Sequence, residues 1–159
     1  MILRPAISAD APAIATLWND IIARTAFTFT TLHKTEAGLI ADITSRGGAF
    51  HVALDGDTML GFATYSQFRG GPGYARTMEH SVMLAPAARG HGVGRALMQV
   101  IEGHAQAQGV HSLWAGISAE NLAAVAFHAA IGFREIAVLP EVGYKFGRWM
   151  DLVLMQKML

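Results

Sequence analysis

Three glycines occupy alternate positions between an apolar stretch and a helical pattern, at Gly90, Gly92 and Gly94, with Arg89 before them and Arg95 directly after. The first amides of a helix have no internal acceptor, and the helix dipole adds partial positive charge there. A glycine-rich turn in front of a helix lets the backbone bring those amides close to an anion. The segment therefore has the composition of a phosphate-binding loop, although a flexible connection closed by glycine would have the same composition.

The spacing of the glycines distinguishes between the common phosphate-binding loops. A Walker loop ends in Gly-Lys-Ser/Thr, whereas Gly94 is followed by Arg95 and Ala96. A Rossmann fingerprint has the spacing G-x-G-x-x-G early in a βαβ unit, whereas these glycines follow G-x-G-x-G far along the chain. The remaining pattern is Arg-x-x-Gly-x-Gly, formed by Arg89, Gly92 and Gly94.

Glu79 is a second residue suited to chemistry, because it lies within a strand-like stretch among Thr77, Ser81 and Val82. A carboxylate partly withdrawn from water has a raised pKa and accepts a proton more readily near neutral pH. Glu79 is therefore a candidate general base, and the alternative is an ordinary glutamate on an exposed strand face. We expect no metal site, because Glu79 and the adjacent His80 point to opposite faces of a strand, and His91 adds no ligand spacing.

Periodicity and turn signals predict the elements that position these residues. Strands are predicted over residues 2–5, 50–54, 59–68, 74–84, 111–117, 133–139 and 148–155, and helices over 12–24, 35–46, 93–108 and 121–130. This order predicts an α/β (α+β) fold with a mixed central sheet of about seven strands flanked by about four helices. No linker divides the chain, so residues 1–159 are expected to form a single domain.

Two details of the packing are also predicted. Val93, Leu97, Val100 and His104 are expected to mark one face of the helix that follows the glycines, and Gly109 to end that helix. Near the end of the chain, aromatic and aliphatic side chains are expected in the sheet core, namely Phe146, Trp149 and Leu152.

Composition excludes several classes of function. Twelve basic and twelve acidic residues give a formal net charge of zero, without the basic excess of a nucleic-acid-binding protein. There is no apolar run of transmembrane length and no signal-peptide pattern, so we expect a cytoplasmic protein without a membrane partner. The absence of cysteine excludes disulfides, thiolate metal sites and a cysteine nucleophile.

Several segments together resemble one superfamily. The glycine loop resembles the acetyl-CoA pyrophosphate loop of the GNAT N-acetyltransferases. Residues 121–133 resemble the second GNAT signature, Asn-x6-Tyr-x4-Gly-Phe, with His128 in place of the usual tyrosine. Residues 3–10 are similar to the opening strand and helix start of the family. These matches occur in the order of the family and cover nearly the whole chain, which implies the GNAT fold and acetyl-CoA as co-substrate.

A narrower resemblance points to the phosphinothricin and methionine sulfoximine acetyltransferases. It is carried by residues 74–82, 127–128 and 145–151, and residues 26–29 resemble the substrate loop of that branch. The resemblance implies acetyl transfer to the primary amine of a small amino-acid-like substrate, with Glu79 at the acid/base position of the branch. Direct attack in a ternary complex is expected, because no cysteine can carry the acetyl group. Members of this branch are commonly homodimers, and a homodimer is expected here.

The resemblance also implies a set of cofactor-binding residues. They are Val82, Met83, Leu84, Arg89, Gly90, His91, Gly92, Val93, Gly94, Arg95, Asn121 and His128. The first three would act through their backbone on the pantetheine arm. Asn121 is equally suited to cap the helix that it precedes, and His128 to pack within the core. His128 is also a candidate catalytic acid for the leaving thiolate, with hydrogen bonding to the cofactor as the alternative.

The substrate pocket of the branch is matched at four positions, Thr28, Phe29, Arg69 and Tyr74. The segment Gly70–Gly73 departs from the branch, which has another basic residue there. Arg76, Lys145 and Arg148 are alternative contributors, including across a dimer interface. Three further functions stay open: a protein or peptide N-terminal acetyltransferase, a non-catalytic acetyl-CoA-binding module, and an α/β domain with a flexible glycine loop.

Overall fold

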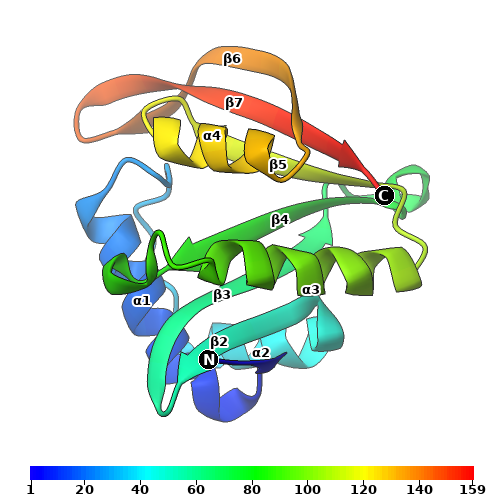
Figure 1. Cartoon of the computed structure of the whole chain (residues 1–159). Helices are drawn as coiled ribbons and strands as arrows, with labels where there is room; N and C mark the ends of the chain where they lie inside the picture. Colours follow the sequence, from blue (N-terminus) through cyan, green and yellow to red (C-terminus); the bar gives the residue numbers. More distant parts are fainter.

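A mixed seven-stranded sheet forms the centre of the molecule in the computed structural model, which describes residues 1–159 (Figure 1). The strand order is β1-β2-β3-β4-β5-β7-β6. The strands are β1 (Ile2–Pro5), β2 (Phe50–Asp55), β3 (Thr58–Gln67), β4 (Thr77–Leu84), β5 (Ser112–Ser118), β6 (Arg134–Lys145) and β7 (Arg148–Met158). All neighbouring strands are antiparallel except β4 and β5, which are parallel.

Helices cover both faces of this sheet. The helices α1 (Ala11–Arg24) and α2 (Glu36–Arg46) pack on one face, over a core that contains Phe50 and Phe62. The helices α3 (Val93–Ala107) and α4 (Leu122–Ala130) lie on the other face, in front of the sheet in Figure 1, over a core that contains Leu97, Ile101 and Leu113. The predicted fold class and the predicted order of elements are confirmed.

Local signals in the sequence account for several helix boundaries. The Thr35 hydroxyl accepts a hydrogen bond from the Gly38 N–H (3.1 Å) and caps α2, and the Asn121 side chain accepts one from the Ala124 N–H (3.2 Å) and caps α4. Gly109 follows α3 with φ of 75°, as predicted for a glycine that ends a helix.

Several strand boundaries differ from the prediction, most of them by one residue, and β7 continues to Met158 instead of ending at Met155. β4 begins at Thr77 rather than Tyr74, because Pro72–Tyr74 form a helical turn in which the Tyr74 N–H donates to the Gly71 carbonyl (3.3 Å). β6 continues past Leu139 to Lys145, although Pro140 lies within it. It is the edge strand of the sheet and its register shifts after Leu139, which accommodates a residue without an N–H donor.

The packing face of α3 was predicted partly wrongly. Val93 and Leu97 are buried, but Ile101 and Ala105 continue the buried face, while Val100 and His104 are only half-buried. At 3.6 residues per turn, the buried residues Val93, Leu97, Ile101 and Ala105 follow one another in steps of about 40° around the helix, and Val100 and His104 lie near one edge of this buried arc. The His104 ring instead reaches the Tyr65 hydroxyl, at 2.7 Å.

The prediction that Phe146 and Trp149 lie in the sheet core is wrong. These side chains are 53% and 59% exposed, and Leu152 is half-buried. Both aromatic residues lie at the turn of the β6–β7 hairpin, which extends beyond the cover of α4 (Figure 1). They therefore form part of an exposed surface rather than of the core.

Candidate active site

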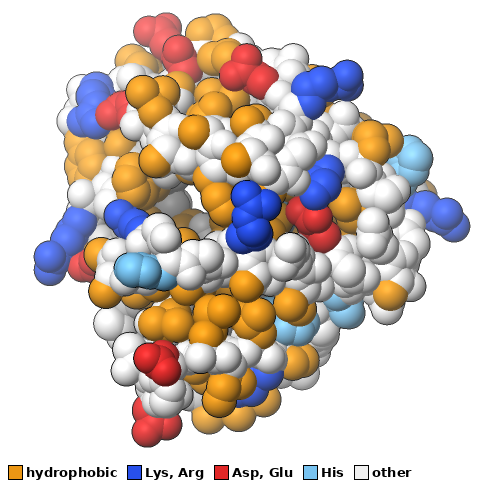
Figure 2. Space-filling view, viewed as in Figure 1, with side chains coloured by type: hydrophobic (Ala, Val, Ile, Leu, Met, Phe, Trp, Pro, Cys, Tyr) orange, Lys and Arg blue, Asp and Glu red, His pale blue; other side chains and the backbone are white.

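The parallel strands β4 and β5 are paired over only three residue pairs, from Thr77 with Ser112 to Glu79 with Trp114. Beyond this point β4 stays paired with β3 and β5 stays paired with β7. The two strands therefore separate after Glu79, and their facing edges line a cavity of about 530 Å³. Figure 2 shows the surface hollowed between α4 and the start of α3. Volumes of this size are typical of small-molecule sites.

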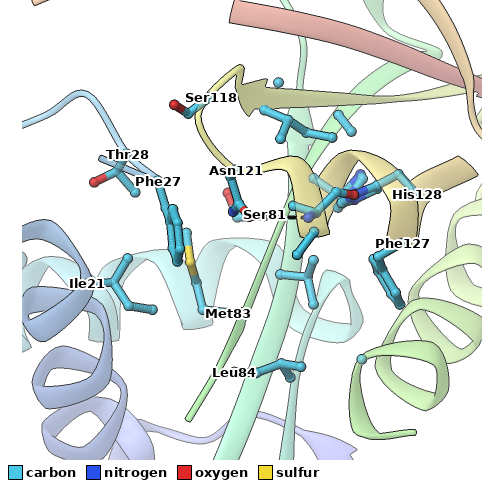
Figure 3. A pocket seen from close by; sticks show the side chains of 18 of the residues that line it. Ile21, Phe27, Thr28, Ser81, Met83, Leu84, Ser118, Asn121, Phe127 and His128 are labelled. Atoms are coloured by element: carbon cyan, nitrogen blue, oxygen red, sulfur yellow. Dashed lines mark hydrogen bonds between the residues drawn. The ribbon is translucent and has the colours of Figure 1, made fainter. Parts of the chain in front are cut away.

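Seven segments of the chain form the walls of this cavity. They are α1 at Trp18 and Ile21, the loop between α1 and α2 (residues 27–30 and 34), β4 from Glu79 onward, the loop before α3 with the first turn of that helix, β5 from Ala115 onward, α4 with its cap, and β7 at Leu152. Figure 3 shows Phe27 and Thr28 on one side of the cavity and Phe127 and His128 of α4 on the opposite side. The site thus joins elements from both halves of the sheet.

Glu79 lies where the two strands separate, and its side chain forms no ion pair with any basic residue. The residue is exposed at the opening of the cavity, and the partial withdrawal of its carboxyl from water between the two strands raises the pKa of that carboxyl above the ordinary value, as expected of a general base. A side chain at Gly116 would place its Cβ 2.9 Å from Glu79 Oε1, so the glycine leaves room for the carboxylate. Gly116 was not among the predicted site residues, although a glycine within a strand often marks a close approach of another group.

The glycine loop presents a continuous row of backbone donors. None of the six N–H groups of Gly90–Arg95 donates a hydrogen bond within the protein. Gly90 and Gly92 both have φ of 79°, a conformation that glycine adopts without strain. The Gly92 carbonyl accepts the Ala96 N–H (3.0 Å) and begins α3, whose dipole adds partial positive charge at this end. This geometry suits an anionic group.

The predicted cofactor residues lie in or next to the cavity. Those that line it are Val82, Met83, Leu84, Arg89, Gly90, Gly94, Asn121 and His128. The others, His91, Gly92, Val93 and Arg95, lie in the same loop and the first turn of α3, outside the lining. Asn121 both caps α4 and lines the cavity, so its two predicted roles are compatible.

His128 is buried, and both of its ring nitrogens are engaged within the protein. Its Nδ1 lies 2.7 Å from the Ala124 carbonyl oxygen, and its Nε2 lies 2.9 Å from Nε2 of His80. A carbonyl oxygen only accepts, so Nδ1 of His128 carries the proton, and Nε2 then accepts the hydrogen bond that His80 donates. Burial lowers the pKa of both rings, to about 3 for His80, which keeps the pair neutral.

The structure brings two of the four predicted substrate residues into the cavity wall, namely Thr28 and Phe29. Arg69 and Tyr74 lie outside the lining, in the exposed loop before β4, where the guanidinium is 5.9 Å from the tyrosine ring centroid. The alternative basic residues do not line the cavity either. Arg148 is paired with Glu120 at 2.7 Å, Arg76 is exposed, and Lys145 is buried behind the loop that carries Thr28.

No group of three or more His, Cys, Asp or Glu side chains is placed to hold a metal ion. None of the helices is both long enough and apolar enough to cross a membrane.

Residues 15–133 match the acetyltransferase (GNAT) family, and the chain belongs to this family. It is an acetyl-CoA-dependent N-acetyltransferase. An L-methionine sulfoximine/L-methionine sulfone acetyltransferase of Salmonella typhimurium is 34% identical over 98% of this chain and 93% of its own length. A phosphinothricin N-acetyltransferase of Streptomyces coelicolor is 33% identical over 94% and 91%.

Two solved structures show the same fold at similar identity. A ribosomal-protein-alanine N-acetyltransferase from Brucella melitensis superposes with a TM-score of 0.94 at 36% identity, with full coverage of both chains. An acetyltransferase from Salmonella typhimurium, solved with its cofactor acetyl-CoA, superposes with a TM-score of 0.95 at 34% identity, covering 100% of this chain and 94% of the other.

Proposed function

We propose that this enzyme acetylates the primary amine of a small amino-acid-like substrate of the phosphinothricin, methionine sulfoximine or methionine sulfone type. The observation that carries the proposal is the position of Glu79, a carboxyl of raised pKa at the fork between β4 and β5, in one cavity with the glycine loop. Relatives that act on such compounds, at 33–34% identity over nearly the whole chain, support the substrate class. We take residues 1–159 as one catalytic domain, since both cores pack on one sheet.

In this proposal the cofactor lies along the side of the cavity formed by β4 and α3. The amides of Gly90–Arg95 bind the pyrophosphate, with added positive charge from Arg89 and Arg95. The backbone of Val82–Leu84 binds the pantetheine arm, because β4 has no partner strand on its cavity side beyond Glu79. His91 and Val93 contribute through the backbone of the loop, and Asn121 borders the cavity from the opposite side.

Acetyl transfer then proceeds by direct attack in a ternary complex. Glu79 removes a proton from the substrate ammonium, directly or through a water molecule, and the free amine attacks the thioester carbonyl. A backbone N–H of β4 stabilises the developing negative charge on the carbonyl oxygen. The C–S bond breaks and the thiolate of coenzyme A takes up a proton. Both ring nitrogens of His128 already form hydrogen bonds within the protein. This supports a role for His128 in shaping the cofactor side of the cavity rather than in protonating the leaving thiolate.

On the substrate side, the loop that carries Thr28 and Phe29 forms one wall of the pocket. Arg69 and Tyr74 are proposed at the entrance, because their loop leads directly into β4 and reaches Glu79 within five residues of Tyr74. Their exposed position is consistent with a contact to the outer, polar end of a substrate rather than to the reacting amine.

The amine specificity is tested by thiol release from acetyl-CoA with a panel of amines. The panel contains phosphinothricin, methionine sulfoximine, methionine sulfone, common amino acids, polyamines and short peptides. We expect the first three compounds to give the highest kcat/KM, at least about tenfold above the polyamines, since a tenfold difference needs only about 1.4 kcal/mol of selective binding. If no amine accelerates thiol release, the result would favour the non-catalytic acetyl-CoA-binding module.

A peptide N-terminal acetyltransferase is the second candidate function. The observation in its favour is the Brucella melitensis structure, whose protein is described as a ribosomal-protein-alanine N-acetyltransferase and matches this chain over its full length. If a peptide beginning with alanine has a higher kcat/KM than methionine sulfone in the same assay, the peptide function would replace the small-molecule proposal.

The exposed apolar surface of β6 and β7 supports a homodimer. Six large apolar side chains of β6, its turn and the start of β7 are 42–59% exposed, namely Ile136, Val138, Val142, Tyr144, Phe146 and Trp149. Several exposed apolar side chains on one hairpin are typical of an interface. We expect Trp149→Glu to convert a dimer to a monomer in sedimentation velocity, with Ile7→Glu, at a 54% exposed site on another part of the chain, unchanged. A monomeric wild-type protein would exclude the homodimer.

A further inference from the structure

Lys145, the last residue of β6, is a buried cation without a counter-ion. Its side chain is 2% exposed, and no carboxylate pairs with it. Its Nζ donates to the carbonyl oxygens of Thr25 (2.8 Å) and Thr28 (2.9 Å) and lies 3.4 Å from Thr28 Oγ1. Burial lowers the pKa of this ammonium group. All three acceptors belong to the loop between α1 and α2, more than a hundred positions away along the chain.

Hydrogen bonds of this kind give the loop a fixed conformation. An ammonium group is unfavourable away from water unless its donors are satisfied, and here oxygens of the loop accept its hydrogen bonds, while the ring centroid of Phe146 lies 5.0 Å from Nζ. The loop contains no helix or strand between Arg24 and Glu36, so its own backbone offers few alternatives. These hydrogen bonds therefore keep the Lys145 side chain in place and keep the loop packed against β6.

Two further contacts hold the same loop. A Cβ at Gly143 of β6 would lie 2.5 Å from Cγ of Phe29, so the ring packs directly on the strand backbone. At the other end, the Asn19 side chain exchanges hydrogen bonds with the backbone of Lys34, at 2.9 and 2.7 Å. Between these points, residues 27–30 line the cavity on the side opposite α4 (Figure 3).

We propose that Lys145 is a positioning residue for the amine pocket, because its ammonium group holds residues 25–29 as a rigid wall opposite α4. The inference rests on the proposed function, in which this wall contacts the amine. Lys145 does not line the cavity, so it acts through Thr28 and Phe29. Its effect falls on the KM for the amine and leaves the glycine loop and Glu79 unchanged.

The test compares Lys145→Met with Lys157→Met. Methionine keeps the apolar length of the side chain and removes the donors. Lys157 serves as the control because its Nζ also donates to a backbone carbonyl, that of Ile131 (2.8 Å), although it differs in pairing with Glu102 (2.6 Å), and it lies outside the cavity lining. We expect Lys145→Met to raise the KM for the amine about tenfold or more, with kcat at saturating amine and the KM for acetyl-CoA within about twofold of wild type. Lys157→Met should leave all three constants unchanged.

A second variant and a second measurement make the proposal independent of folding and of the proposed function. Gly143→Ala displaces the Phe29 ring with Lys145 intact, and it should also raise the KM for the amine. In limited proteolysis, Lys145→Met should be cut between residues 25 and 34 faster than wild type and Lys157→Met. The proposal would be overturned if a folded Lys145→Met enzyme has the same KM for the amine as wild type. It would also be overturned if this variant is cut between residues 25 and 34 no faster than wild type. A wild-type enzyme that acetylates no amine would instead overturn the proposed function, and proteolysis would still decide whether Lys145 holds the loop.

Discussion

Replacing Glu79 with glutamine is expected to lower the kcat of acetyl transfer by a factor of about 10² to 10⁴, the usual contribution of a general base. Glutamine has the same shape and fits the space beside Gly116, but it cannot accept the proton of the substrate ammonium. Binding of acetyl-CoA, measured by calorimetry, should be nearly unchanged, because the glycine loop is not altered. Full activity in this variant would show that Glu79 is not the base.

The pH dependence of the wild-type enzyme gives a second readout of the same residue. The base acts in its deprotonated form, so kcat/KM should fall as the pH decreases through the pKa of Glu79, which burial raises above the ordinary range. The Glu79→Gln variant should lack this acidic limb. Glu135→Gln serves as the control, because Glu135 is an exposed glutamate of β6 outside the cavity lining, and it should retain both the rate and the acidic limb.

Replacing Gly92 with valine is expected to weaken acetyl-CoA binding by at least about tenfold, or about 1.4 kcal/mol. The φ of 79° at Gly92 is unfavourable for a β-branched residue, and the added side chain lies on the loop whose amides are proposed to bind the pyrophosphate. The dissociation constant is measured by titration calorimetry, and the free energy of unfolding by denaturant titration.

Gly109→Val is the matched control for this prediction. Gly109 lies at the other end of α3 with φ of 75°, and a Cβ added at either glycine would meet no neighbouring atom within 4 Å. The two variants should therefore lose similar stability, whereas only Gly92→Val should lose affinity for acetyl-CoA. Equal affinity in both variants would contradict the assignment of the loop.

Features encoded locally could be predicted from the sequence. The glycine spacing and the helix that follows identified the loop before α3, and side-chain caps such as Asn121 marked where helices begin. Glu79 was identified because a carboxylate within a strand pattern is unusual, and because its position matches the acid/base position of a related family. The exact start of β4 could not be predicted, because the turn at Pro72–Tyr74 competes with an extended pattern.

Features that depend on distant contacts could not be predicted. Lys145 was predicted only as an alternative contributor to the substrate pocket, and only the return of the α1–α2 loop to β6 shows that it is buried behind that loop. Gly116 is significant only because Glu79 lies across from it on the neighbouring strand. Trp149 was expected in the core from its apolar character, but its burial depends on whether a helix covers that part of the hairpin.

The separation of β4 from β5 after Glu79 also affects how firmly the two halves of the sheet are connected. Three residue pairs are all that connect the strands β1–β4 to the strands β5–β7 within the sheet. A pantetheine arm along β4 would form hydrogen bonds with the part of this strand that β5 leaves unpaired. The cofactor would then act as a partial eighth strand. Any ligand bound only by the folded state stabilises it by an amount that increases with the concentration of the ligand relative to its dissociation constant. If the donor substrate binds as proposed, its binding would also strengthen the connection between the two halves of the sheet.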